Sequence, residues 1–323
     1  MHRKAVRPGR APAPGPEGPR SLTRDILILG WCAAWVLGIA AAPAAAEDVQ
    51  LRFRGITLNA NLELAEGKSA SDGIVLITHG LMAHHRMELV STLQALLKER
   101  GRSSLAITLG LGRDDRRGPV DCALAHRHRR SDALDEIGAW IAWLKSRGAG
   151  PLALLGHSMG GNETAWYAAT RDDPAVRAVV LLAPATWDPA RTAERYRARH
   201  GEALAGVLAR ARALADSGRG SALMENTGFL YCPGASRVTA DSFLSYYGGA
   251  PDRHTPALLP RIAKPTLVIA GTEDRVVPDV IDTVRPMADG RKLRLVAVDG
   301  AGHFFRDLFA EDVADAIDDF LPF

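Results

Sequence analysis

An apolar run that leads straight into a glycine and serine turn is the feature that most constrains this chain. Residues Leu152–Leu155 are all apolar, and Gly156-His-Ser-Met-Gly160 follows at once, in the pattern G-x-S-x-G. This order fits a buried strand that turns sharply into a helix and leaves Ser158 exposed at the apex. The two glycines let the strand and helix backbones approach where a Cβ would clash. Ser158 is therefore a candidate nucleophile, provided that a histidine and an acid follow it along the chain.

Strand-like and helix-like segments alternate on both sides of this turn. Residues 51–53 and 56–64 predict an antiparallel start. Apolar runs then predict buried strands at 73–78, 104–108, 152–155, 178–182, 266–270 and 293–298, with amphipathic helical patterns between most of them. Repeated strand–helix units predict an α/β fold, a doubly wound and mostly parallel sheet with helices on both faces. Residues 186–260 break this rhythm, and we expect them to form a cap insert of helices followed by loops.

Two later strands end beside the partners that Ser158 needs. The strand at 266–270 leads into Asp274, and the strand at 293–298 leads into His303. The carboxyl ends of parallel strands meet at one edge of a sheet, so the three side chains are expected to meet there. A serine hydroxyl is a weak nucleophile until an imidazole takes its proton, and a carboxylate orients that imidazole. We assign Ser158 as nucleophile, His303 as base and then acid, and Asp274 as the orienting group.

Taken together, these motifs resemble the α/β-hydrolase superfamily, and within it small exported bacterial serine hydrolases of the esterase type. The resemblance covers about residues 49–323 and rests on four motifs: Gly156-His-Ser-Met-Gly160, Gly271-Thr-Glu-Asp274, Gly302-His303 and His79-Gly80. It implies the α/β-hydrolase sheet and an oxyanion hole made of the backbone N–H groups of Leu81 and Met159. It also favours Asp274 over the neighbouring acids Glu273 and Asp279, because the Val276-Val-Pro278 that follows looks like the family pattern.

The expected activity is cleavage of a carboxylic ester of a small molecule through an acyl-enzyme, with no cofactor and no metal. A peptidase, a thioesterase or an acyltransferase would use the same triad. A non-catalytic protein could also keep the fold and bind a ligand in its capped cleft. The sequence leaves these alternatives open, together with the acyl and alcohol specificity and the oligomeric state.

Other histidine and glycine motifs carry less information. His84-His85 lies just past the oxyanion loop and is either a substrate contact at the pocket rim or, as we favour, a solvated polar turn. His126-x-His128 lacks further ligands at the spacing of a zinc site. Gly110-Leu-Gly112 lacks the third glycine of a dinucleotide-binding turn, so no such site is expected.

The first 46 residues are typical of an export signal. A basic segment over 3–24 precedes an apolar segment over 26–39, and Pro43-Ala-Ala-Ala46 supplies a small-residue cleavage site. We predict cleavage after Ala46 and a domain at 47–323 that is periplasmic or secreted. The alternative is an uncleaved N-terminal helix that anchors the protein, and the start codon in use is a further open point.

Charge excludes one class of partner, and two cysteines raise one structural question. The whole chain has a net charge of +3, and residues 1–46 contribute +4, so the body of the protein has a net charge of −1. A nearly neutral body predicts neither nucleic-acid binding nor stable membrane association once the leader is removed.

Cys122 and Cys232 are the two cysteines of that body. In an exported chain they form either one disulfide or two unrelated buried thiols, and the sequence does not decide between them.

Overall fold

The computed structural model describes residues 46–232 and 236–323. All of the described residues belong to one compact unit. The predicted leader lies outside the described residues except for Ala46. None of the helices in the described part of the chain combines the length and the hydropathy needed to span a bilayer.

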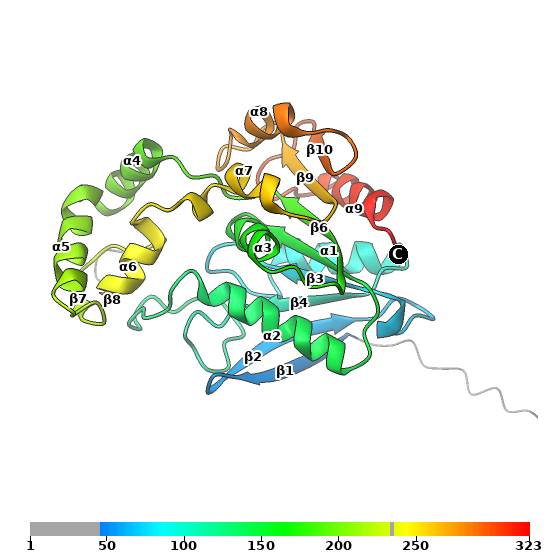
Figure 1. The fold of residues 1–323 in the computed structure, drawn as a ribbon, viewed down its shortest axis with the longest axis horizontal. Coiled ribbons are helices and arrows are strands. Elements are labelled where there is room, and N and C mark those ends of the chain that lie inside the picture. Colours follow the sequence, from blue (N-terminus) through cyan, green and yellow to red (C-terminus); the bar gives the residue numbers. More distant parts are fainter. Residues whose placement is uncertain (1–45, 233–235) are drawn as a thin grey trace, which may run out of the picture. The chain divides into compact units, whose positions relative to one another are not determined.

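One eight-stranded sheet forms the centre of this unit (Figure 1), in the spatial order β1-β2-β4-β3-β5-β6-β9-β10. Only the pairs β1–β2 and β2–β4 are antiparallel, so β2 alone runs opposite to the rest of the sheet. The other strands pair in parallel, which confirms the predicted α/β-hydrolase sheet. The strands are β1 (Glu47–Phe53), β2 (Ile56–Glu63), β3 (Ile74–Thr78), β4 (Ser104–Thr108), β5 (Leu152–His157), β6 (Val176–Leu182), β9 (Thr266–Gly271) and β10 (Leu293–Val298).

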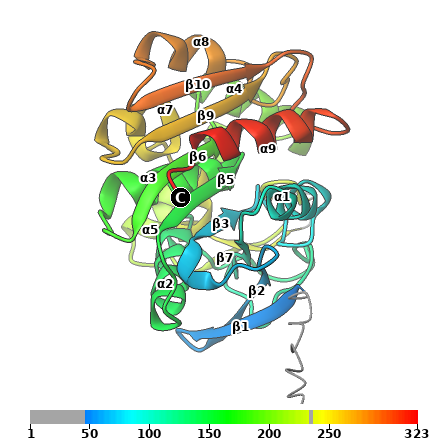
Figure 2. The same ribbon diagram turned by 90° about the vertical axis from the view of Figure 1, so that its right-hand side faces the viewer.

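Helices cover both faces of the sheet, so its central strands are buried throughout. On one face α1 (Glu88–Glu99) contacts α9 (Phe309–Phe320), and on the other α2 (Asp132–Ser146) contacts α3 (Met159–Thr170). Figure 2 shows these two layers on opposite sides of the strands. Helix α9 buries Ala310, Val313, Ala314 and Ile317, the spacing of one helical face. Between β9 and β10 the helix is short: α8 covers Val280–Val284, and a 3₁₀ turn follows at Arg285–Met287.

The cap lies between β6 and β9, at the left of Figure 1. It contains α4 (Pro189–His200), α5 (Leu204–Asp216), the short pair β7 (Leu223–Met224) and β8 (Val238–Thr239), and α6 (Ala240–Tyr247); α7 (Thr255–Leu258) leads back to β9. It has its own apolar cluster, which includes Val207, Phe229 and Phe243. The first two helices are followed mostly by turns and loop up to β8, as expected, but the helix α6 that comes next was not expected. Thr239 caps α6 by accepting a hydrogen bond from the Ser242 N–H, and Phe243 is buried in the cap cluster.

A disulfide between Cys122 and Cys232 joins the cap to the long loop after β4. Two backbone hydrogen bonds lie nearby on the same two segments: the His126 N–H donates to the Arg237 carbonyl at 2.7 Å, and the Thr239 N–H donates to the His126 carbonyl at 3.0 Å. Of the two states that the sequence left open for these cysteines, the structure contains the disulfide. The bond closes a loop of 110 residues, which restricts the unfolded chain strongly.

Candidate active site

Ser158 occupies a strained turn between β5 and α3. Its backbone has φ 56° and ψ −119°, a conformation that is rare for a residue with a side chain. A Cβ at Gly156 would collide with the carbonyl oxygen of Gly160, and a Cβ at Gly160 would collide with the carbonyl oxygen of His79. Both glycines are therefore required for the close approach of helix, strand and loop, as the sequence pattern predicts.

The loops after β9 and β10 bring two more side chains to Ser158. His303 Nε2 lies 2.9 Å from Ser158 Oγ, and His303 Nδ1 lies 2.7 Å from Asp274 Oδ2. With Nδ1–H donating to the carboxylate, Nε2 is free to accept the serine proton. Asp274 and His303 are 5% and 7% exposed, so little water competes for these bonds. The structure thus brings the three predicted residues together, while their catalytic roles stay predictions.

The two neighbouring acids, Asp279 and Glu273, do not reach His303. Asp279 Oδ1 accepts hydrogen bonds from Thr186 Oγ1 at 2.7 Å and from Arg191 Nη1 at 2.8 Å. Glu273 is exposed. Neither carboxylate has a hydrogen bond to His303 among the described residues, so the geometry favours Asp274.

The environment of Asp274 stabilises its ionised form. Burial acts to raise the pKa of this carboxyl group. The hydrogen bond from His303 and those from the backbone N–H groups of Val277 and Val276 outweigh burial, so the pKa lies below its usual value. The carboxylate is therefore fixed by the backbone on one oxygen and presents the other to the imidazole.

Two further histidines are neutral and hold the loops around the serine. Burial and the neighbouring imidazole of His303 lower the pKa of His157 to about 3, and its Nε2–H donates to the carbonyl of His303 at 3.0 Å. Burial and the charge of Arg116 lower the pKa of His79 well below its usual value. His79 Nδ1–H donates to the Gly80 carbonyl at 2.7 Å, and its Nε2 accepts from the Leu109 N–H at 3.0 Å. Both rings position backbone rather than exchange protons.

Arg116 was missed by the sequence analysis, although it supports the predicted oxyanion loop. Its guanidinium is buried and donates to His79 Nε2 at 3.1 Å, to the Leu109 carbonyl at 2.8 Å and to the Gly118 carbonyl at 2.7 Å. In the sequence it stands in an arginine- and aspartate-rich loop, which is typical of a solvated segment. Only the fold shows that the loop turns this side chain inward.

The predicted oxyanion donors, Leu81 and Met159, flank the serine. Neither backbone N–H has a hydrogen-bond acceptor within the described residues. Both residues line a pocket of about 590 Å³ between the cap and the strand ends, together with Arg275 and Val276 of the loop after Asp274. A developing oxyanion requires backbone N–H donors of this kind, and the role of Leu81 and Met159 stays a prediction.

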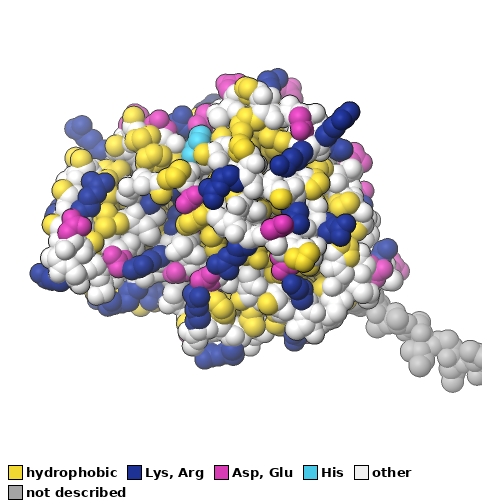
Figure 3. All heavy atoms as spheres, viewed as in Figure 1, with side chains coloured by type: hydrophobic (Ala, Val, Ile, Leu, Met, Phe, Trp, Pro, Cys, Tyr) yellow, Lys and Arg dark blue, Asp and Glu magenta, His cyan; other side chains and the backbone are white. Residues whose placement is uncertain are grey.

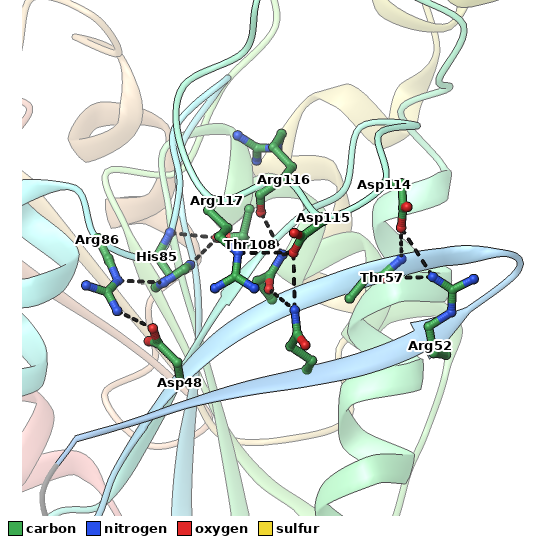
Figure 4. Close-up of polar contacts among 12 residues, drawn as sticks. Asp48, Arg52, Thr57, His85, Arg86, Thr108, Asp114, Asp115, Arg116 and Arg117 are labelled. Carbon is green, nitrogen blue, oxygen red and sulfur yellow. Dashed lines mark hydrogen bonds and ion pairs between the residues drawn. The ribbon is translucent and has the colours of Figure 1, made fainter.

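His84 and His85 do not line that pocket. His85 is buried, and its backbone N–H and Nδ1 both bond to Thr108 Oγ1 at the end of β4. Its Nε2 accepts from Arg86 Nε at 3.2 Å, and Arg86 in turn pairs with Asp48 of β1. Figure 4 shows this chain of contacts running across the edge of the sheet. His84 Nδ1 accepts from the backbone N–H of Arg86 at 3.2 Å. The expected solvated turn was wrong for His85, which is 3% exposed, and both histidines make local structural contacts. A contact of either residue with substrate stays a prediction.

The His126-x-His128 motif is part of the cap interface. His128 Nδ1 lies 3.1 Å from the Tyr246 hydroxyl, and both rings pack near Phe229, with centroids at 5.0 and 6.0 Å. Burial lowers the pKa of His126 to about 4 and that of His128 to about 3. Within residues 46–232 and 236–323, no group of three or more His, Cys, Asp or Glu is arranged to hold a metal ion.

A buried glutamate beneath the cap makes stability depend on pH. Glu163 of α3 is 3% exposed, and its carboxyl group has no hydrogen-bond partner in the described structure. Burial raises its pKa from 4.5 to about 8, against the attraction of Arg130. The folded protein therefore holds a proton that the unfolded chain releases above about pH 4.5. Stability from this group is complete below that pH and is lost as pH rises toward about 8, at about 1.4 kcal/mol per pH unit.

Replacing Glu163 with glutamine is expected to remove this dependence, because the amide resembles the protonated acid. Urea unfolding from pH 4 to pH 9 should show Glu163→Gln more stable than the wild type by several kcal/mol near pH 8, with the gap closing toward pH 4.5. Glu66→Gln, at an exposed position, is the matched control and should show no such trend. A constant gap at every pH would contradict the assignment of a raised pKa.

Comparisons with known proteins were consistent with this fold. Residues 74–316 match the sequence profile of the Alpha/beta hydrolase family. No protein with a curated function matches the chain. Ferulic acid-bound Est1E from Butyrivibrio proteoclasticus has a TM-score of 0.59 and 20% identity over 84% of this chain and 97% of that chain. The monoacylglycerol lipase of Paleococcus ferrophilus has a TM-score of 0.54 and 21% identity, over 81% and 97%. An esterase domain from Rhodothermus marinus has a TM-score of 0.54 and 16% identity, over 85% and 97%. At these identities the similarity concerns the fold.

Proposed function

Because the chain belongs to the alpha/beta hydrolase family, we propose that it is a serine hydrolase that cleaves a carboxylic ester. The observation that carries this proposal is the hydrogen-bonded series from Ser158 through His303 to Asp274, with bonds of 2.9 and 2.7 Å. The esterases and the lipase of similar fold support it only at the level of architecture. The fold by itself does not select ester over peptide or thioester.

In the proposed reaction, Ser158 Oγ attacks the ester carbonyl while His303 Nε2 takes the hydroxyl proton. The carbonyl oxygen becomes an oxyanion and accepts hydrogen bonds from the N–H groups of Leu81 and Met159. The imidazolium, held by Asp274, then gives its proton to the departing alcohol, and the C–O bond breaks to leave an acyl-serine. A water molecule, deprotonated by the same imidazole, attacks this acyl group and releases the acid.

The test is hydrolysis of nitrophenyl esters by the purified protein under conditions that resolve the first turnover. An acyl-enzyme predicts saturable release of nitrophenol, with a burst no larger than the enzyme concentration whenever deacylation is slower than acylation. Acetate, butyrate and octanoate esters would show which acyl lengths the pocket accepts. If none of these esters is hydrolysed faster than in buffer alone, the ester hydrolase proposal fails.

We also propose that the domain at 47–323 acts outside the cytoplasm, as a periplasmic or secreted enzyme on small-molecule esters. The leader pattern of residues 1–46 supports export. The Cys122–Cys232 disulfide supports an oxidising compartment. Protein recovered from the periplasm or the medium is expected to begin at Glu47. A membrane-bound protein with an intact N-terminus would favour the anchored alternative.

A further inference from the structure

The pocket beside Ser158 has a one-sided charge. Its walls include Arg195 and Arg199 of α4 and Arg275 of the loop after β9, and no aspartate or glutamate lines it among the described residues. Elsewhere, on the face drawn in Figure 3, basic and acidic side chains are interspersed. A concave site with charge of one sign concentrates the field on a bound ligand. The charged side chains that line this pocket are therefore all positive.

Arg195 ties the cap to the loop of the candidate catalytic acid. Its Nη1 donates to the Val276 carbonyl at 3.0 Å and its Nη2 to the Arg275 carbonyl at 3.4 Å. These bonds use backbone oxygens, so they leave the positive charge of the guanidinium without a carboxylate partner. They also hold α4 next to the residues that follow Asp274.

The other two arginines retain their donors. The Arg199 guanidinium lies 4.3 Å from the ring centroid of Tyr231, a cation–π contact that orients the group without neutralising it. Arg275 has no side-chain hydrogen bond or ion pair within the described part of the chain. Asp279, the acid next to this loop, is already bound by Arg191 and Thr186. Three positive charges thus face one pocket with no acid in its walls.

Much of the remaining wall is aromatic or aliphatic and suits a flat or apolar ligand body. It includes Trp187, Tyr196, Tyr231 and Tyr247. The hydroxyl of Tyr196 donates to the Gly228 carbonyl at 2.9 Å, and that of Tyr247 accepts from the Leu230 N–H at 3.0 Å. The wall also holds the polar side chains of Thr186, Thr192 and His200, and burial lowers the pKa of His200. The guanidinium groups are therefore the groups of this wall that carry a full charge at neutral pH.

We propose that the substrate is an ester that carries a second, anionic group, such as a carboxylate, which binds to Arg199 and Arg275 at the pocket rim. Guanidinium groups with free donors bind oxyanions through charge-assisted hydrogen bonds. The volume of about 590 Å³ holds a small ester together with that group. This inference rests on the proposed function, because it concerns the substrate of the same site.

The experiment compares esters that differ by one charge. Nitrophenyl hexanoate and mono-nitrophenyl adipate have acyl chains of equal length, and the second ends in a carboxylate. In a second pair, nitrophenyl hexanoate and 3-carboxy-4-nitrophenyl hexanoate, the acyl group is the same and the extra carboxylate lies on the leaving phenol. At low ionic strength the wild type should have kcat/KM about tenfold higher for at least one anionic ester than for nitrophenyl hexanoate, after correction for chemical reactivity, and salt should reduce this ratio.

For the variants, the readout is kcat/KM for the anionic ester divided by kcat/KM for nitrophenyl hexanoate, and not either value alone. A disturbance of the loop that holds Asp274 would lower both rates, whereas loss of anion recognition lowers only the anionic one. Arg199→Ala and Arg275→Ala are each expected to reduce the ratio by about two- to fivefold, and the double variant to bring it near one. Arg197→Ala is the matched control, because Arg197 is exposed on the same helix but does not line the pocket.

The outcomes separate this inference from the proposed function. Equal kcat/KM for neutral and anionic esters in the wild type would overturn the inference and leave the esterase intact. So would a preference that survives in the double variant or that Arg197→Ala also removes. Hydrolysis of none of the esters would instead overturn the proposed function.

Discussion

Replacing Ser158 with alanine is expected to lower kcat/KM for nitrophenyl esters by about 10⁴- to 10⁶-fold. The reason is that Ser158 Oγ is the atom placed 2.9 Å from His303 Nε2, so its loss removes the acceptor of the acyl group. The measurement is nitrophenol release, with background hydrolysis subtracted. Circular dichroism and the melting temperature of the variant show whether it is folded.

Ser91→Ala provides the matched control, because Ser91 is an exposed serine on α1. Its activity should stay within about twofold of the wild type. Activity retained by folded Ser158→Ala protein would mean that another group is the nucleophile or that a contaminating esterase is responsible.

The second large effect is expected from Asp274→Asn, which should lower kcat by about 10⁴-fold. The asparagine oxygen can still accept from the Val276 and Val277 N–H groups, as Asp274 Oδ1 does at 2.7 and 3.0 Å. Its amide N–H₂ then faces His303 Nδ1 and requires that nitrogen to accept. The ring proton moves to Nε2, where it prevents the imidazole from taking the serine proton. The loop should stay in place while the histidine takes the wrong tautomer.

Glu273→Gln is the control for this variant. It removes the adjacent carboxylate, which is exposed and has no hydrogen bond to His303, and it should change kcat by no more than about twofold. A strong loss of activity in Glu273→Gln together with a mild effect of Asp274→Asn would show that the orienting acid is misassigned.

The turn at Ser158 and the three site residues could be predicted because their sequence signals are local. An apolar run followed by G-x-S-x-G fixes a strand and a turn within ten residues. Asp274 and His303 each follow another apolar run within five residues. The rule that parallel strands end at one edge then connects three separate segments without further information.

Other features depend on contacts between distant segments, and the sequence has no local signal for them. Cys122 and Cys232 pair across 110 residues. Arg116 reaches His79 from a loop whose composition is that of a solvated segment. The arginines at the pocket rim come from α4 and from the loop after β9, and only the placement of the cap brings them together. Helix α6 is an exception, because Ala240, Phe243, Leu244 and Tyr247 do have helical spacing, but the helix is only eight residues long and packs on the cap cluster.

The most direct test of the central claim is covalent labelling of the folded protein with a fluorophosphonate, followed by peptide mass spectrometry. The reagent requires an activated serine nucleophile and does not depend on knowing the substrate. We expect one adduct per chain, located on Ser158, and no adduct in Ser158→Ala. A folded protein that gains no adduct, or gains it at another residue, would contradict the account and favour a ligand-binding protein of the same fold.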